Sequence, residues 1–269
     1  MTTVDAGAVA DRRRPGLARY GVAGMAGLLV LLEVLPRIGV VSPDYLPPAS
    51  RIAAALADEA GTAQFWAGIR DTLVAWAIGL LIAVVAGVVV GVIIGSVPVL
   101  RAFTASTVEF LRPIPSVALI PLAVLLYGTD LRSTLLLVVY AAFWQVLVQV
   151  LYGVADVDPV ADETARSYRL GPWARVRYLL WPTALPYVLT GVRLAAAVAL
   201  ILAITTELVI GSPGLGAQIA VAQSSQAVPT MYALVFVTGL LGVGINVIAR
   251  AAEHRLLAWH QSVRGEVIP

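Results

Sequence analysis

The chain has 269 residues, of which 59% are hydrophobic and 13% are charged, and its formal net charge is +2. A soluble domain typically carries about 25% charged residues, so this composition excludes an ordinary soluble protein and predicts an integral membrane protein. The sequence has no cysteine, which excludes disulfides and thiolate metal sites, and no lysine, which excludes the lysine-containing P-loop that binds ATP phosphates.

The first apolar run, residues 20–35, follows a polar tail of residues 1–19 that contains four arginines. No small-residue cleavage site follows the run, so we expect a transmembrane helix that begins in the cytoplasm and not a removed signal peptide. Residues 42–71 are rich in proline at first and then place apolar residues at helical spacing. This pattern predicts a short helix on the external surface of the membrane.

The second span, residues 72–97, carries Gly87, Gly91 and Gly95, one small residue in every four. Such spacing lines one face of a helix and predicts close packing against another helix, within the chain or across a dimer. A bent cytoplasmic-side segment is predicted next, and then a third span over residues 111–127. This span contains three prolines, which are tolerated where neighbours satisfy the freed carbonyls, so we expect it inside the helix bundle.

The fourth span, residues 134–154, places Gln145 and Gln149 one helical turn apart. The two amides either face a water-filled pathway or hydrogen-bond to a neighbouring helix. The sequence leaves both interpretations open.

The fifth span, residues 187–210, contains Thr206 and Glu207. Inserting a carboxylate there costs about 2.5–3.5 kcal/mol, so Glu207 is expected to face protein or water. It lies at a gate or subunit seam, or it is a hydrogen-bonded structural acid. The glutamine-rich residues 212–230 are predicted to be external, and the sixth span covers residues 231–249.

Residues 156–185, called the elbow below, form the one long charged segment between these spans. Asp158-Pro159 predicts a helix start, because aspartate can cap free N–H groups and proline fits the first helical position. Gly171-Pro172 predicts the end of this helix and the start of a second one, which Trp181-Pro182 ends. So polar a segment must lie in water, between two membrane helices.

The order Glu163-Thr164-Ala165, followed by Leu179-x-Trp181-Pro182, resembles the E-A-A…G…I-x-L-P loop of bacterial ABC importer permeases. Arg169 stands where that family usually has glycine, and Gly171 follows two residues later, which predicts a turn shifted toward Gly171. Thr164 and Trp181 replace an alanine and a leucine of the family pattern. Two further stretches, residues 111–122 and 182–194, are similar to the branch that imports sulfonates, taurine and nitrate.

The resemblance implies an all-α membrane protein with a type I ABC importer permease fold and about six transmembrane helices, in a bacterial inner membrane. It implies a homodimer, lipid contact, a separate ABC ATPase that holds ATP and magnesium, and an extracytoplasmic solute-binding protein. We expect no cofactor, catalytic residue, metal site or nucleic-acid partner for this chain. The residues assigned to ATPase coupling are Glu163, Thr164, Ala165, Arg166, Arg169, Gly171, Pro172 and Pro182. A pathway or gate role is predicted for Gln145, Gln149, Thr206 and Glu207.

Topology follows from the arginines. Fourteen of the eighteen fall on the proposed cytoplasmic side, and the other four are Arg37, Arg51, Arg70 and Arg132. The positive-inside rule therefore predicts that both termini are cytoplasmic. The chain divides into a tail of residues 1–19, a permease domain of residues 20–250 and a second tail of residues 251–269.

The sequence thus predicts the permease subunit of an ATP-driven importer, with a small sulfonate, taurine or nitrate-like anion as the family-based substrate. An importer of a thiamine precursor or another heterocycle is one alternative. Another is a secondary transporter driven by an ion gradient, a class that favours inverted repeats and several ionisable groups at the midplane. The sequence shows no internal repeat and one convincing buried acid, and no acid–base cluster favours a membrane enzyme.

Overall fold

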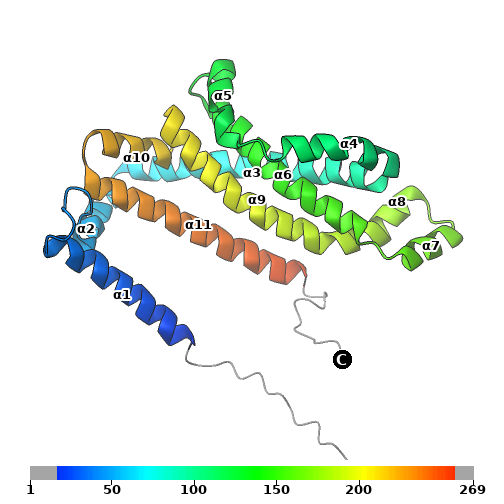
Figure 1. Ribbon diagram of the computed structural model, residues 1–269, viewed down its shortest axis with the longest axis horizontal. Coiled ribbons are helices and arrows are strands. Elements are labelled where there is room, and N and C mark those ends of the chain that lie inside the picture. The colour runs from blue at the N-terminus through cyan, green and yellow to red at the C-terminus, as the bar shows by residue number, and fades with distance from the viewer. Residues whose placement is uncertain (1–16, 258–269) are drawn as a thin grey trace, which may run out of the picture.

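The structure, a computed structural model, describes residues 17–257, and the regular elements in this range are all helices (Figure 1). The predicted tails lie mostly outside the described residues. In chain order the elements are α1 (Leu17–Arg37), α2 (Ala49–Ala60), α3 (Ala63–Ser96), α4 (Pro98–Leu111), the 3-10 turn η1 (Ser116–Leu119), α5 (Ile120–Tyr127), α6 (Leu131–Ala155), α7 (Pro159–Ser167), α8 (Pro172–Arg175), the π-helical turn η2 (Val176–Leu180), α9 (Trp181–Ile210), α10 (Leu215–Ser224) and α11 (Val228–Leu256).

Five helical segments of the described range are long and apolar enough to cross a membrane, and α4 with η1 and α5 forms a bent sixth. The prediction of about six spans is thereby confirmed. The second span begins at Ala63, earlier than predicted, because the Thr62 hydroxyl accepts the N–H of Phe65 at 3.2 Å and caps the helix. Helices α2 and α10 lie at one end of the bundle, and α7 and α8 lie at the other (Figure 1).

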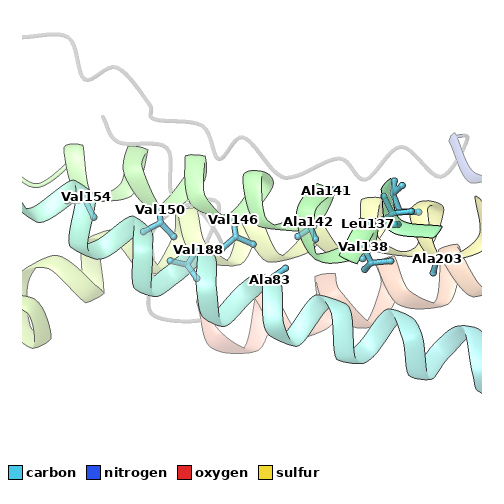
Figure 2. Close-up of a cluster of buried hydrophobic side chains, with 14 residues drawn as sticks. Ala83, Leu137, Val138, Ala141, Ala142, Val146, Val150, Val154, Val188 and Ala203 are labelled. Atoms are coloured by element: carbon cyan, nitrogen blue, oxygen red, sulfur yellow. The ribbon is translucent and has the colours of Figure 1, made fainter. Parts of the chain in front are cut away.

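Helices α3 and α6 run parallel and in close contact. Each predicted packing glycine of α3 lies against a valine of α6, in the pairs Gly87 with Val146, Gly91 with Val150 and Gly95 with Val154. Figure 2 shows these valines following one another along the bundle. A Cβ atom on Gly87 would lie 2.8 Å from the Cβ of Val146, so only glycine allows this approach.

Helix α9 packs antiparallel against α6 and also contacts α3. Gly153 of α6 lies against Ala184, and Gly191 of α9 lies against Gln149. The indole N–H of Trp76 donates to the carbonyl of Ala196 at 2.9 Å and ties α3 to α9. The three helices therefore form one packed unit, with α6 at its centre.

The third span differs from the prediction. Helices α4 and α5 meet at 81°, because Pro113 and Pro115 remove backbone donors at the junction and break the helix. The Ser133 hydroxyl donates to the carbonyls of Ala123 and Gly128, at 3.1 and 2.6 Å, and satisfies the end of α5. Ala123 is the one buried residue of α5, so the prediction that this span lies inside the bundle is wrong for the chain by itself.

The second elbow helix does not end at Trp181-Pro182 as predicted. Helix α8 continues through η2 directly into α9, so residues 172–210 form one helical segment. A proline ring inside an α-helix clashes with the carbonyl four residues earlier, which for Pro182 belongs to Tyr178. The wider π-helical turn around Tyr178 relieves this clash and lets the helix continue.

Candidate functional site

The elbow begins as the sequence predicts. The Asp158 carboxylate accepts the N–H of Val160 at 2.8 Å, and Pro159 occupies the first helical position of α7. The cap satisfies one of the free N–H groups at the start of the helix. A helix of only nine residues is marginal alone, so its caps and tertiary links decide whether it forms.

The turn after α7 lies at Arg169, and the predicted shift to Gly171 is wrong. Arg169 has a φ of 55°, in the left-handed region, whereas Gly171 has an extended backbone with a φ of −64°. The N–H of Leu170 donates to the carbonyl of Ala165 at 2.9 Å, and the N–H of Arg169 to that of Arg166 at 2.8 Å. These two bonds form a Schellman motif, with Arg169 at the position that usually carries glycine.

Asp162 joins the two halves of the elbow. It pairs with Arg166 of its own helix at 2.8 Å and with Arg175 of α8. The hydrogen bond from Arg175, and then that from Arg166, hold the pKa of Asp162 below its ordinary value of 3.8. The hairpin is thus fixed from inside by one carboxylate and two guanidinium groups.

The outer surface of the elbow is exposed in the described chain. Glu163 and Thr164 are exposed, and so are Tyr168 at 79% and Trp173 at 77%. Ala165 is the one buried residue of α7. Large aromatic side chains beside charged groups, on a backbone that is held rigid, are typical of a protein-binding surface.

At the opposite end of α9, Glu207 is buried with 1% of its surface exposed. The Thr72 hydroxyl donates to its carboxylate at 2.7 Å, and the N–H of Gly216 donates to it at 3.0 Å. Thr72 in turn accepts the N–H of Leu215 at 2.9 Å. Glu207 therefore ties α3, α9 and the start of α10 together, and no lining residue of a described cavity is Glu207 or its neighbour Thr206.

The two glutamines of α6 have different surroundings. The Cβ of Gln149 packs against Gly191, since a Cβ atom added to Gly191 would lie only 3.0 Å from it. Gln149 therefore lies at the contact between α6 and α9. Gln145 lines a cavity of about 580 Å³ between α6 and α4. The structure thus separates a pair that helical spacing placed on one face.

The sequence interpretation missed three residues. Thr72 organises the Glu207 contacts, and its position at the start of an apolar run was the available signal. Arg101 and Arg112 line the same cavity as Gln145. Their separation of eleven residues, three turns of helix, places them on one face, but only with the knowledge that residues 98–111 form a continuous helix.

Five helical segments and one bent pair that are long and apolar enough to cross a membrane, packed through small residues and extended at one end by the charged elbow, define the described chain as a multi-pass membrane protein. The chain belongs to the family of binding-protein-dependent transport system inner membrane components, whose model matches residues 83–258.

Curated relatives align over nearly the whole chain. The aliphatic sulfonates transport permease protein SsuC of Bacillus subtilis is 27% identical over 264 residues, covering 96% of this chain and 95% of the relative. The taurine transport system permease protein TauC of Escherichia coli is 29% identical over 256 residues, covering 92% and 93%. The riboflavin transport system permease protein RibX of Chloroflexus aurantiacus is 29% identical over 243 residues, covering 89% and 91%.

Solved structures show the same fold. The chain matches an inward-facing MetNI methionine ABC transporter with a TM-score of 0.60 and 20% identity, over 70% of this chain and 94% of that one. It matches a bacterial ABC transporter for the polysaccharide alginate with a TM-score of 0.61 and 14% identity, over 89% and 96%. The protein is therefore the permease component of an ABC importer and a multi-pass inner-membrane protein. The family match and the relatives favour this function over a secondary transporter driven by an ion gradient.

Proposed function

We propose that two copies of this chain form the membrane pathway of an importer for small organic sulfonates such as taurine. Each elbow docks on one copy of an ABC ATPase, which binds ATP and magnesium, and an extracytoplasmic solute-binding protein delivers the substrate. The observation that carries the proposal is the elbow itself. It is a capped, internally paired hairpin whose charged and aromatic outer surface has no partner in the described chain.

The elbow suits mechanical coupling because it is continuous with a long helix. Residues 172–210 form one helical segment, whose 39 residues correspond to a length of roughly 58 Å. Arg193 of this segment pairs with Glu253 of α11 at 3.0 Å, and Glu207 fixes its far end to α3. A displacement of the elbow by the ATPase would therefore move the far end of α9, which is the basis for a gate role of Thr206 and Glu207.

The arginines support a cytoplasmic elbow. Arg166, Arg169 and Arg175 lie in the elbow, whereas Arg51 of α2 and Arg132 at the start of α6 belong to the opposite end of the bundle (Figure 1). The positive-inside rule then places the elbow in the cytoplasm. Arg112 is an exception to the sequence-based count, because it follows Leu111, whose carbonyl accepts a hydrogen bond from Tyr140 in the middle of α6.

Exposed apolar side chains on α4 and α5 support a homodimer. Phe103, Phe110 and Leu125 are 84%, 73% and 81% exposed, and the prolines between the two helices direct α5 away from the bundle (Figure 1). A second copy that packs on this face would cover the bent span. The external segment with α10 and the exposed Gln223 and Gln226 is the corresponding surface for the solute-binding protein.

The ATPase contact is tested by affinity purification of the tagged chain with its ATPase. Glu163→Ala removes an exposed elbow carboxylate with no ion pair in the described chain and is expected to reduce the recovered ATPase several-fold. The control, Asp58→Ala, removes an exposed carboxylate from α2 at the other end. Equal recovery of the ATPase with both variants would count against elbow docking.

Topology and substrate need separate tests. Because the chain has no cysteine, Tyr168→Cys and Gln223→Cys each introduce a single thiol. An impermeant maleimide added to intact cells should label the second and not the first. In vesicles with the ATPase and the binding protein, ATP-dependent uptake of taurine supports the proposed substrate, and uptake of riboflavin without taurine would replace it.

A further inference from the structure

The cavity of about 580 Å³ between α4 and α6 has a polar wall. Helix α4 contributes Arg101, Thr104 and Glu109, and Arg112, the residue after its last turn, lines the same cavity. Helix α6 contributes Gln145, whose amide makes no hydrogen bond in the described chain. A volume in this range is typical of small-molecule sites, which span about 300–1,000 Å³.

The two arginines of this wall are not neutralised by the described chain. Neither Arg101 nor Arg112 forms an ion pair among the described residues, although Glu109 lines the same cavity. One protomer therefore contributes two cations and one anion, a net positive charge. A concave surface with unpaired guanidinium groups favours an anionic ligand, since a guanidinium group can bind two oxygens of one acidic group.

The depth of Arg112 in the membrane distinguishes a transported anion from the phosphate group of a lipid. The Tyr140 hydroxyl donates to the carbonyl of Leu111 at 2.8 Å, which places the adjacent Arg112 level with Tyr140. Tyr140 precedes the last residue of α6, Ala155, by fifteen residues, or roughly 22 Å of helix. Lipid phosphates lie at the membrane surface, whereas a charged group at this depth marks a water-filled path or a ligand site.

We propose that this cavity is an anion-binding site on the import pathway, where Arg112 and Gln145 hold the sulfonate group of the solute. Arg101 of α4 precedes Arg112 by eleven residues, lies nearer the elbow end, and offers the next cation toward the cytoplasm. The inference rests on the proposed importer function and deepens it, because it assigns recognition of an acidic head group to this chain. Arg112 and Gln145 act as binding residues that touch the solute.

Single cysteines test the charge of the cavity without transport. Ala105→Cys places a thiol in the lining, and Ala54→Cys places one on an exposed position of α2, away from the cavity and from the α4 face proposed for the second copy. We compare the anionic reagent methanethiosulfonate ethylsulfonate with its cationic trimethylammonium counterpart, on membranes that contain the whole importer. The anionic-to-cationic rate ratio should be at least five-fold higher at residue 105 than at residue 54.

Two additions make this measurement specific for the solute. Taurine should slow the reaction of the anionic reagent at residue 105. Ethanolamine, which has a hydroxyl in place of the sulfonate group of taurine, should not. Arg112→Gln should abolish both the rate preference and the protection. The same assay in nanodiscs compares phosphatidylcholine alone with added phosphatidylglycerol. Equal ratios at residues 105 and 54, or protection by phosphatidylglycerol equal to that by taurine, would overturn the solute site.

Uptake separates this inference from the importer proposal. In proteoliposomes with the ATPase and the binding protein, Arg112→Gln should reduce taurine uptake at least ten-fold, and Arg112→Lys should retain part of it. The control, Arg132→Gln, removes an arginine from the other end of the bundle and should leave uptake unchanged. Full uptake by Arg112→Gln overturns the anion site but not the proposed importer function. An absence of ATP-dependent taurine uptake by the wild type refutes the proposed substrate.

Discussion

Gly87 tests the contact between α3 and α6 most directly. In Gly87→Ala the new Cβ would lie 2.8 Å from the Cβ and 2.9 Å from the Cγ1 of Val146, and 3.3 Å from the backbone nitrogen of Leu147. Carbon atoms pack at about 3.5–4.0 Å, so the helices must separate by several tenths of an ångström. Gly91 and Gly95 make similar contacts along the same line, so the separation cannot stay local.

The expected cost follows from two opposing terms. Overpacking of a well-packed contact costs about 1–3 kcal/mol, and replacing a helical glycine with alanine returns up to about 1 kcal/mol. With the full return, a net loss of up to about 2 kcal/mol is expected for Gly87→Ala. Gly24→Ala on α1 meets no atom within 4 Å and serves as the matched control.

The assay is the thermal midpoint of the detergent-solubilised importer, measured by size-exclusion chromatography after heating. Gly87→Ala should lower the midpoint relative to Gly24→Ala. The second change Val146→Ala removes the colliding methyl groups, so the double variant should recover part of the loss, with a coupling energy of about 1 kcal/mol. Equal midpoints for the two glycine variants, or strict additivity with Val146→Ala, would refute the steric argument.

Three further predictions address the elbow and the buried carboxylate. Thr72→Val leaves Glu207 and a backbone N–H of α10 each without one buried partner, so it should cost about 1–3 kcal/mol per group and lower the thermal midpoint, whereas Thr72→Ser should not. The folded-state pKa of Asp162 is lowered, so its link to Arg175 stabilises the elbow above pH 3.8 and is lost as the pH falls through the lowered value. The protection of α7 amides against hydrogen exchange, relative to their intrinsic rates, should fall there, and Asp162→Asn should remove this pH dependence. Arg169→Gly should relieve about 1 kcal/mol of left-handed strain and slow exchange in α7, and faster exchange would contradict the assigned turn.

The elbow shows how far local rules reach. Asp158 and Pro159 specify the start of α7 through interactions within a few residues, and the sequence predicts it correctly. Whether the second helix ends at Pro182 depends on whether the backbone can avoid the clash of the proline ring with the carbonyl of Tyr178. The π-helical turn avoids this clash, so the helix continues. The turn lies at Arg169 because the hydrogen bonds that close α7 outweigh the cost of its left-handed backbone, a balance that residue preference alone misjudges.

The sequence by itself determined the membrane class, the number of spans and the charged elbow, because hydropathy and charge act residue by residue whatever the packing. Only the tertiary structure decided which side chains meet. Gln145 and Gln149 share a helical face in the sequence, yet one lines a cavity and the other packs on Gly191. Glu207 finds Thr72, 135 residues away, as its hydrogen-bond donor. Such contacts depend on how whole helices pack side by side, and no local pattern of residues records that arrangement.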